Sequence, residues 1–178
     1  MTEPQQADPR PAQSPGEDVL AFREAFRRHA AGVAIVTTRA SDGSPVGFTA
    51  TSLASLAASP PLATFNMART ASSWRAVSEV DDVIVHLLGA RNEQAARRMA
   101  GPAAMRFADD DDWLVGPRGL PLMRGVTAWF SGRIVERLPV EGNAVVVVRV
   151  EGGGTGLDDD ALLYHDRRYL TPGRPIDQ

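Results

Sequence analysis

Runs rich in valine, isoleucine and threonine recur along this chain, and several are separated by turns too short to hold a helix. The runs span 33–38, 45–53, 62–67, 83–88, 126–138, 144–150 and 162–164. Turn signals at Ser41–Ser44 and Pro139–Gly142 make hairpins of the runs on either side of them. Strands in hairpin order predict an antiparallel sheet or barrel with helices outside it. A Rossmann sheet is not expected, because strands and helices do not alternate regularly.

Three short helices are expected around these strands. The first is capped by Asp18 and ends at Gly32, a glycine at the position where helices commonly stop. The second covers 72–80 and the third covers 92–100.

Proline is concentrated near the two ends of the chain. Residues 1–16 hold four prolines among polar residues and alanines, and such a segment cannot bury enough apolar surface to offset its ordering entropy. We therefore expect a disordered tail over 1–16, one domain over 17–171 and a short tail over 172–178.

Composition excludes several classes of protein. The formal net charge is −3 at pH 7, so neither nucleic acid nor an anionic membrane is favoured as a partner. Cysteine is absent, which excludes disulfides, thiolate zinc sites and iron–sulfur clusters. Lysine is absent too, which excludes a Walker A loop and a Schiff base. The polar N-terminus lacks the apolar core of a signal peptide, and no apolar run approaches the ~18 residues of a membrane span, so we expect a cytoplasmic protein.

The sequence does not predict a metal site or a catalytic side chain. His29, His86 and His165 are far apart and have no carboxylate at ligand spacing. The acidic run Asp109–Asp112 lacks the ligand spacing of an EF-hand and is interpreted as a solvated turn. The segment Gly152–Gly156 lacks the spacing of a dinucleotide fingerprint and is interpreted as a loose loop.

One strand-like segment, Pro45–Leu53, is unusually rich in small and hydroxyl residues. Along a strand, Thr49 and Thr51 face one way while Ala50 and Ser52 face the other. Small residues let a backbone approach a flat ligand closely, and hydroxyls and amides can bond a polar edge such as that of a flavin. The same residue types also suit an ordinary half-exposed strand.

Two further clusters carry hydroxyl or cationic groups. The segment Asn66–Trp74 holds Arg69 and two serines at an expected helix start, where free N–H groups and a cation favour an anion. An ordinary helix cap has the same composition. Arg106 is interpreted either as a phosphate clamp or as a surface residue.

Short pieces of the sequence follow one another in a characteristic order and spacing: Phe22-Arg23, Ala31–Thr38, Asp42-Gly43, Val46–Ala50, Ser55-Leu56, Ser59–Leu62, Ser72-Ser73, Arg106-Phe107, Gly119–Leu122 and Leu162–Tyr164. In this order they resemble the short-chain flavin reductase family, over nearly the whole chain from Phe22 to Tyr169. The resemblance implies a mainly β fold with peripheral helices, in the form of a split antiparallel β-barrel of the FMN-binding type, usually as a homodimer.

The same resemblance implies a function and a set of contacts. Proteins of this family reduce FMN or FAD with NADH or NADPH and hand the reduced flavin to a partner monooxygenase. Flavin contacts are implied for Pro45, Val46, Gly47, Thr49, Ala50, Thr51, Ser52, Phe65, Asn66, Thr70, Ser72, Ser73, Ala100 and Arg106. Nicotinamide contacts are implied for His165 and Arg168. Hydride passes directly between the two cofactors, so no protein acid or base is required.

One departure from the family pattern keeps other functions open. Members commonly carry Gly-Asp-His where this sequence reads Gly142-Asn143-Ala144, and the missing histidine lies near the nicotinamide in the family. An FMN-binding carrier or sensor without nicotinamide turnover is therefore an alternative. A split-barrel oxidase acting on another small substrate is a second alternative.

An apolar surface is expected if the chain forms a homodimer. The strand segment Val126–Phe130, with Trp129, is one candidate for it. Ordinary core packing is the other interpretation of the same segment.

Overall fold

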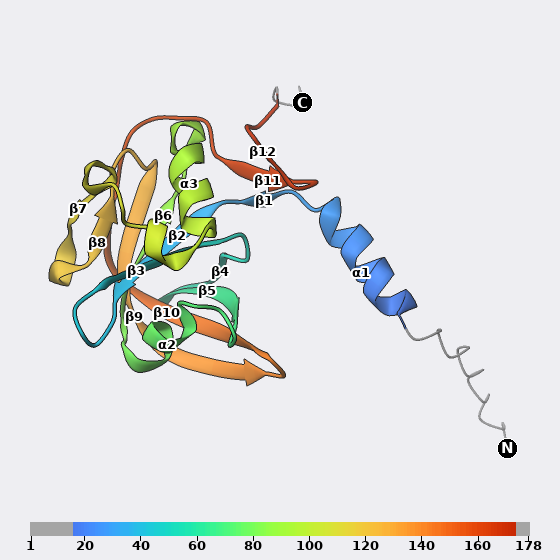
Figure 1. The fold of residues 1–178 in the computed structure, drawn as a ribbon, viewed down its shortest axis with the longest axis horizontal. Coiled ribbons are helices and arrows are strands. Elements are labelled where there is room, and N and C mark those ends of the chain that lie inside the picture. The colour runs from blue at the N-terminus through green and yellow to red at the C-terminus, as the bar shows by residue number, and fades with distance from the viewer. Residues whose placement is uncertain (1–15, 174–178) are drawn as a thin grey trace, which may run out of the picture.

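Residues 16–173 are described by the computed structural model of the chain, and Figure 1 shows their fold. The strands of this part are β1 (Ala31–Gly32), β2 (Ala34–Arg39), β3 (Pro45–Ala50), β4 (Ala54–Ala58), β5 (Pro61–Ala68), β6 (Asp82–Leu87), β7 (Trp113–Val115), β8 (Pro121–Met123), β9 (Ala128–Val140), β10 (Asn143–Thr155), β11 (Leu163–His165) and β12 (Arg168–Leu170). The helices are α1 (Glu17–Arg27), α2 (Trp74–Glu79) and α3 (Glu93–Ala100), with short 3₁₀ turns at Ala90–Asn92, Ala103–Met105, Asp110–Asp112 and Pro117–Gly119.

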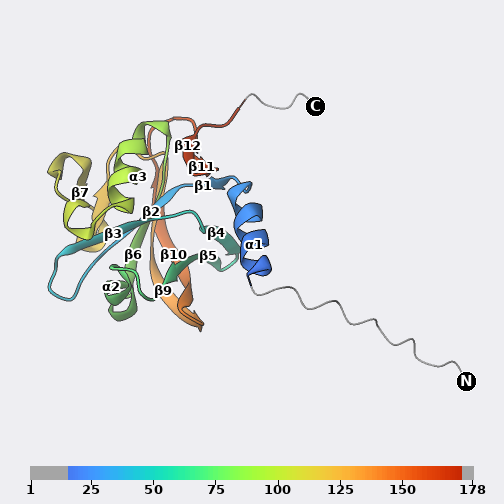
Figure 2. The same cartoon turned by 45° about the vertical axis from the view of Figure 1, so that its right-hand side comes forward.

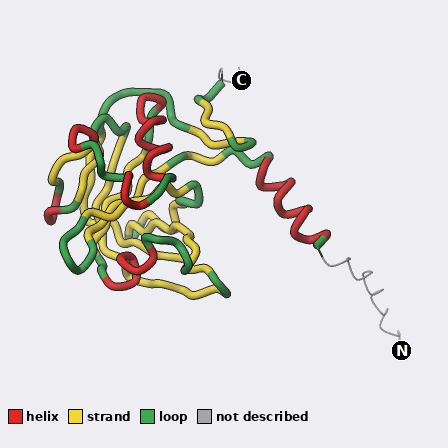
Figure 3. The backbone as a smooth tube through the Cα atoms, viewed as in Figure 1, coloured by secondary structure: helices red, strands yellow, loops and turns green. Residues whose placement is uncertain are grey.

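Seven strands form one antiparallel sheet in the order β3-β2-β6-β9-β10-β5-β4. Strands dominate the body of the molecule, and the helices lie around them (Figure 3). The expected mainly β fold with peripheral helices is therefore confirmed. The edge strands β3 and β4 follow each other in the chain, yet within residues 16–173 no ladder joins them, and the sheet stays open along this seam.

Both faces of the central strands are buried, because apolar residues occupy successive positions along them rather than alternate ones. Val36 of β2 packs with Phe65 in one core cluster, whereas its neighbour Ile35 packs in a second cluster on the opposite face. The helix α3 contributes Ala96 and Met99 to the second cluster. The helix α3 therefore covers the face of the sheet on which the second cluster lies.

The hairpin of β9 and β10 corrects one prediction. The glycines 152–154, expected in a loose loop, lie in β10 and pair with Ser131, Phe130 and Trp129 of β9. A Cβ on Gly153 would lie 2.6 Å from the carbonyl oxygen of Trp129, so a bare backbone is what permits this close pairing. The two strands are joined by Glu141 and Gly142, so the turn predicted over Pro139–Gly142 is present, but Pro139 and Val140 belong to β9.

The first helix also departs from the prediction. It ends at Arg27 rather than Gly32, and its N-cap position is held by Gly16 rather than Asp18. Gly32 instead lies in β1, where it pairs with Leu163 of β11. Pairing with the C-terminal hairpin therefore decides where the helical conformation stops. No residue of α1 is buried; the helix leads away from the sheet in Figure 1 and stands at the outer edge of the body in Figure 2.

The segment 126–130 is explained by core packing. Val126 belongs to the second core cluster, while Trp129 packs against that cluster and Phe130 against the first. The two predicted tails lie largely outside the described residues, which exclude 1–15 and 174–178. Across residues 16–173, none of the helices has the length and apolar character needed to cross a membrane.

Candidate functional site

A cavity of about 270 Å³ lies where β3, β5, the start of α2 and the end of α3 meet. It is lined by Phe48, Thr49, Asn66, Met67, Ala68, Ala71, Ser72, Ser73, Met99, Ala100 and Arg106. Apolar walls are thus combined with two serine hydroxyls, a threonine hydroxyl, an amide and one guanidinium. Such a mixture of apolar surface and a few polar groups is typical of small-molecule sites.

Arg106 ties together the segments that surround this cavity. Its Nη1 donates hydrogen bonds to the carbonyl oxygen of Gly47 at 2.9 Å and to the hydroxyl of Ser73 at 2.8 Å. Its Nε donates to the carbonyl oxygen of Gly101 at 3.0 Å. The guanidinium therefore connects β3, the start of α2 and the residue that follows α3.

The same side chain keeps unused capacity for an anion. In the described part of the chain, no carboxylate forms an ion pair with Arg106, and its Nη2 donates to no protein acceptor. Partial burial lowers the pKa of the Arg106 guanidinium, which still carries its charge at any ordinary pH. A desolvated cation with neutral partners and two free N–H donors favours an anionic group such as a phosphate.

Gly47 allows the close approach of protein to protein on one side of the cavity. A Cβ at this position would lie 2.9 Å from the ring of Phe107 and 3.0 Å from the sulfur of Met99. The sequence predicts that small residues in this strand let the backbone approach a ligand closely. At Gly47, the missing side chain makes room for Phe107 and for Met99, of which Met99 lines the cavity.

Ser52, between β3 and β4, bonds to Asn66 of β5 next to the open seam of the sheet. The backbone N–H of Asn66 donates to the Ser52 hydroxyl at 2.8 Å, and that hydroxyl donates to the carbonyl oxygen of Asn66 at 3.2 Å. The hydroxyl thus takes the place of a neighbouring strand beside β5, beyond the point where β4 begins. The side-chain amide of Asn66 lines the cavity and has no hydrogen-bond partner among residues 16–173.

The structure brings part of the predicted flavin set together. Six of the implied residues line the cavity: Thr49, Asn66, Ser72, Ser73, Ala100 and Arg106. The remaining ones lie outside its lining: Pro45, Val46, Gly47, Ala50, Thr51, Ser52, Phe65 and Thr70. Among these, the side chains of Ala50 and Phe65 are buried in the first core cluster.

Sequence reasoning missed the lining residues Phe48, Met67, Ala68, Ala71 and Met99. Met99 and Met67 are buried residues of a helix and a strand, and nothing in their spacing sets them apart from ordinary core residues. The sequence offered one indication of these two residues, their position next to predicted ones. Met99 directly precedes the predicted Ala100, and Met67 follows the predicted Asn66.

The two residues implied for nicotinamide do not line this cavity. His165 lines a separate cleft of about 750 Å³ between α1 and the β11–β12 hairpin. Arg168 is the register partner of His165 on β12 and is not part of the lining of either space. Ala144, where the family has histidine, is 1% exposed and pairs with Met67 across β10 and β5.

His86 is held as a neutral imidazole in the core. The backbone N–H of Met123 donates to its Nε2 at 3.1 Å, so Nδ1 carries the proton and donates to the carbonyl oxygen of Ile35 at 3.0 Å. Burial lowers the pKa of this histidine to about 4. Across residues 16–173, no three histidine or acidic side chains gather as a metal site would require.

Comparison with known proteins agrees with this geometry. The flavin reductase like domain model matches residues 26–173 of the chain. The chain is 39% identical over 155 residues to the NADH:FMN oxidoreductase of Rhodococcus qingshengii, covering 85% of this chain and 80% of that protein. It is 30% identical over 153 residues to the reductase component of the flavin-dependent trigonelline monooxygenase of Acinetobacter baylyi, covering 86% of this chain and 49% of that longer protein.

A solved structure is similar as well. The flavin reductase domain protein of Arthrobacter sp. FB24 is 48% identical, with a TM-score of 0.85 over 90% of this chain and 98% of that one. The match of the domain model extends over most of the chain and includes every residue of the cavity lining. The protein therefore belongs to the family of flavin reductase like domains.

Proposed function

We propose that this protein is an NAD(P)H:flavin oxidoreductase that reduces FMN or FAD and supplies the reduced flavin to a partner monooxygenase. The observation that carries the proposal is the partly buried guanidinium of Arg106, which has two unused donors at the edge of an apolar, hydroxyl-lined cavity. The relatives support the same reaction, since one is named for NADH and FMN and another for a two-component monooxygenase.

The lining residues fit a flavin with a phosphate tail. Arg106, Ser72 and Ser73 would hold the phosphate, because a guanidinium and hydroxyls are donors suited to its oxygens. Thr49 and Asn66 would bond the polar edge of the ring system, and Phe48, Met67 and Met99 would cover its apolar plane. At about 270 Å³ the cavity is slightly smaller than the 300 Å³ or more typical of enclosed sites, so we expect part of the ligand to extend beyond it.

The redox chemistry would be supplied by a flavin held by these residues, as the acceptor of a hydride from the nicotinamide. The chain contributes orientation and the exclusion of water. Arg106 is the one titratable side chain in the lining, so the residues there bind and align rather than exchange protons. Arg106 holds β3, α2 and the end of α3 in one arrangement, which keeps the walls of the site in register.

Four finer points accompany this proposal. We propose that the open, curled sheet is a split barrel, that 17–171 is one domain, that the chain forms a homodimer, and that His165 and Arg168 contact the nicotinamide. A cytoplasmic location stays a prediction from the sequence. The residues Pro45, Val46, Gly47, Ala50, Thr51, Ser52, Phe65 and Thr70 stay in the proposed flavin set through their backbone groups or their support of lining residues.

A flavin carrier or sensor is the second candidate, and Ala144 favours it. This residue is 1% exposed, and its methyl group cannot supply the hydrogen bonds of a histidine beside the nicotinamide. The two candidates differ in turnover. The carrier retains flavin when purified and leaves NADH unoxidised.

The test is a turnover assay on the purified full chain. FMN or FAD is added with NADH or NADPH, and the loss of the nicotinamide absorbance band is followed. We expect turnover with at least one flavin and one nicotinamide. Flavin binding without turnover in any combination establishes the carrier, and absence of both binding and turnover rejects both candidates.

A further inference from the structure

The helix α1 presents an uncovered apolar surface. Phe22 and Phe26 are 62% and 60% exposed, and their ring centroids lie 4.5 Å apart; Val19, on the same side of the helix, is 47% exposed. No residue of the helix is buried. An isolated helix of 11 residues is marginal in water, because helices in proteins gain most of their stability from packing an apolar face. The structure of α1 therefore requires a partner surface.

Charged side chains near the end of α1 have partners within the chain. Glu24 forms ion pairs with Arg27 at 2.9 Å and with Arg28 at 2.8 Å. At the end of the helix, Asp166 donates its backbone N–H to the carbonyl oxygen of Arg27 at 3.0 Å, which fixes how α1 leaves the C-terminal hairpin. The apolar stripe of α1, by contrast, is left exposed.

A matching groove lies on the open edge of the large sheet. Its volume is about 380 Å³, and its lining includes Leu53, Ala58, Leu62, Leu87, Phe130 and Val150. None of its lining residues carries a charge, and none comes from α1. The strand β4 beside it is an unpaired edge, with Leu56 56% exposed. An apolar groove on an unpaired edge is a surface that natural proteins cover.

The helix and the groove belong to one chain but do not meet in it. Figure 1 shows α1 pointing away from the body of the molecule, with β4 and β5 separated from it. Two complementary surfaces that a single chain keeps apart can be joined by two copies, each giving its helix to the groove of the other. Such an exchange is isologous and closes as a two-fold dimer.

We propose that the apolar stripe of α1 lies in the β4–β5 groove of a second copy of this chain, reciprocally, so that the helices act as exchanged arms. The proposal rests on the homodimer proposed above and assigns its surfaces. At the exposures given, Val19, Phe22 and Phe26 would cover roughly 300 Å² per arm. Counting both arms and both grooves gives roughly 1,200 Å², at the lower end of the range of stable specific interfaces.

The absence of cysteine from the chain makes a clean crosslinking test possible. Val19 and Ala58 are both exposed, the first beside the phenylalanines on α1 and the second in the groove. The double variant Val19→Cys/Ala58→Cys is treated with a short bis-maleimide and its mass is measured under denaturing conditions. The matched control is Ala21→Cys/Ala58→Cys, because Ala21 lies on the opposite side of the helix.

We expect a covalent species of twice the 19.1 kDa chain mass in the Val19 variant and at least tenfold less in the Ala21 control. Equal yields in the two variants overturn the proposal. Crosslinking within one chain, at monomer mass, overturns it too, because the occupant is then the chain's own helix.

Light scattering on the uncrosslinked protein supplies the second measurement. Wild type and the Ala21→Asp variant should have dimer mass, and Phe22→Asp/Phe26→Asp should have monomer mass. A double-aspartate variant that stays dimeric rejects the exchanged arms but leaves the homodimer, whereas a monomeric wild type rejects both. Flavin reduction is assayed separately on the wild type, so a failed oxidoreductase proposal is distinguishable from either result.

Discussion

Arg106 and Ser73 form a 2.8 Å hydrogen bond that joins the segment after α3 to the residue that caps α2. Ser73 is buried, and its hydroxyl also lies 3.4 Å from the carbonyl oxygen of Gly47 on β3. Three segments that are distant in sequence are therefore held together by one guanidinium and one hydroxyl. The cavity is placed between these segments, so its shape depends on this contact.

Replacement of Arg106 by methionine should weaken flavin binding by about 10- to 100-fold, the effect expected when hydrogen bonds to a charged group are lost. Isothermal titration with FMN measures the change. Arg75→Met is the matched control, because Arg75 is exposed and pairs with Glu79 at 3.1 Å, away from the cavity lining. Equal affinity of the Arg106 and Arg75 variants would exclude Arg106 from the phosphate site.

Removal of the Ser52 hydroxyl should open the seam beside the cavity. Ser52→Ala leaves the N–H and carbonyl of Asn66 without their protein partner, and we expect a loss of about 1 kcal/mol in the free energy of unfolding. Urea unfolding measures it, together with a rise in the KM for flavin. Ser55→Ala, on the exposed strand β4, should change neither quantity, and Ser52→Thr should restore both.

Acid should destabilise the protein through His86. Its pKa is about 4 in the folded state, because burial disfavours the charged ring, against an ordinary value of 6.5. As pH falls below 6.5, the unfolded chain binds this proton first, so stability is lost between 6.5 and about 4 and is fully present above 6.5. The loss attributable to this residue is about 3 kcal/mol.

Urea unfolding at several pH values across that window measures the effect, and His86→Gln supplies the comparison. The variant is expected to be less stable at neutral pH, because both hydrogen bonds of the ring are altered, but to depend less on pH. The same pH dependence in both proteins would assign the acid sensitivity to other groups.

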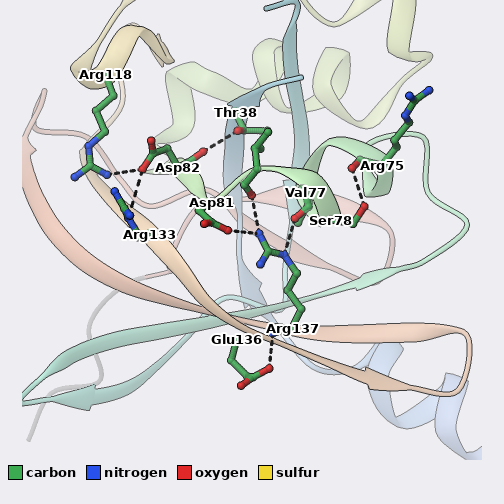
Figure 4. A network of polar contacts seen from close by, with 11 residues as sticks. Thr38, Arg75, Val77, Ser78, Asp81, Asp82, Arg118, Arg133, Glu136 and Arg137 are labelled. Carbon is green, nitrogen blue, oxygen red and sulfur yellow. Dashed lines mark hydrogen bonds and ion pairs between the residues drawn. The ribbon is translucent and has the colours of Figure 1, made fainter. Parts of the chain in front are cut away.

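Arg137 should stabilise α2 from its far end. Its guanidinium donates to the carbonyl oxygens of Val77 at 2.8 Å and Val80 at 2.7 Å and to a carboxylate oxygen of Asp81 at 2.9 Å (Figure 4). These are orphan carbonyls at the end of a helix, so Arg137→Ala should lower the free energy of unfolding by about 2 kcal/mol.

The position of α2 also bears on the cavity, because Ser72 and Ser73 precede it. Arg137→Ala should therefore raise the KM for flavin more than kcat is lowered, and Arg137→Lys should recover part of the loss. Arg133→Ala is the control, since that side chain is 53% exposed and lies 4.0 Å from Asp82. An Arg137 variant as stable as the Arg133 variant would contradict the assignment.

The strands that could be predicted are those whose residues favour a strand by themselves. The runs 83–88 and 144–150 are β-branched almost throughout, and both lie within strands of the large sheet. β4 was missed, because its alanines and serine have little strand preference and only pairing with β5 makes them extended. The glycines of β10 were missed for a related reason, since a close neighbouring backbone is visible only in the fold.

The candidate site was predictable where its side chains carry polar or charged groups. Hydroxyls, an amide and a lone arginine marked Thr49, Asn66, Ser73 and Arg106, which the fold brings into one lining. Apolar walls carry no such mark, so Met99 could not be told from any other core residue. The role of Ser52 was also beyond reach, because its partner Asn66 is 14 residues away and the seam they close exists only after the sheet has formed.

That seam differs in kind from the rest of the sheet. Elsewhere neighbouring strands are joined by ladders of many backbone hydrogen bonds. Beside Asn66, the edge of β5 is held by two hydrogen bonds to the single hydroxyl of Ser52. Releasing them leaves the pairing of β5 with β10 in place, because that ladder lies on the other side of β5. A single hydroxyl therefore holds the edge of the sheet at this point, next to the ligand cavity whose lining includes Thr49 and Asn66.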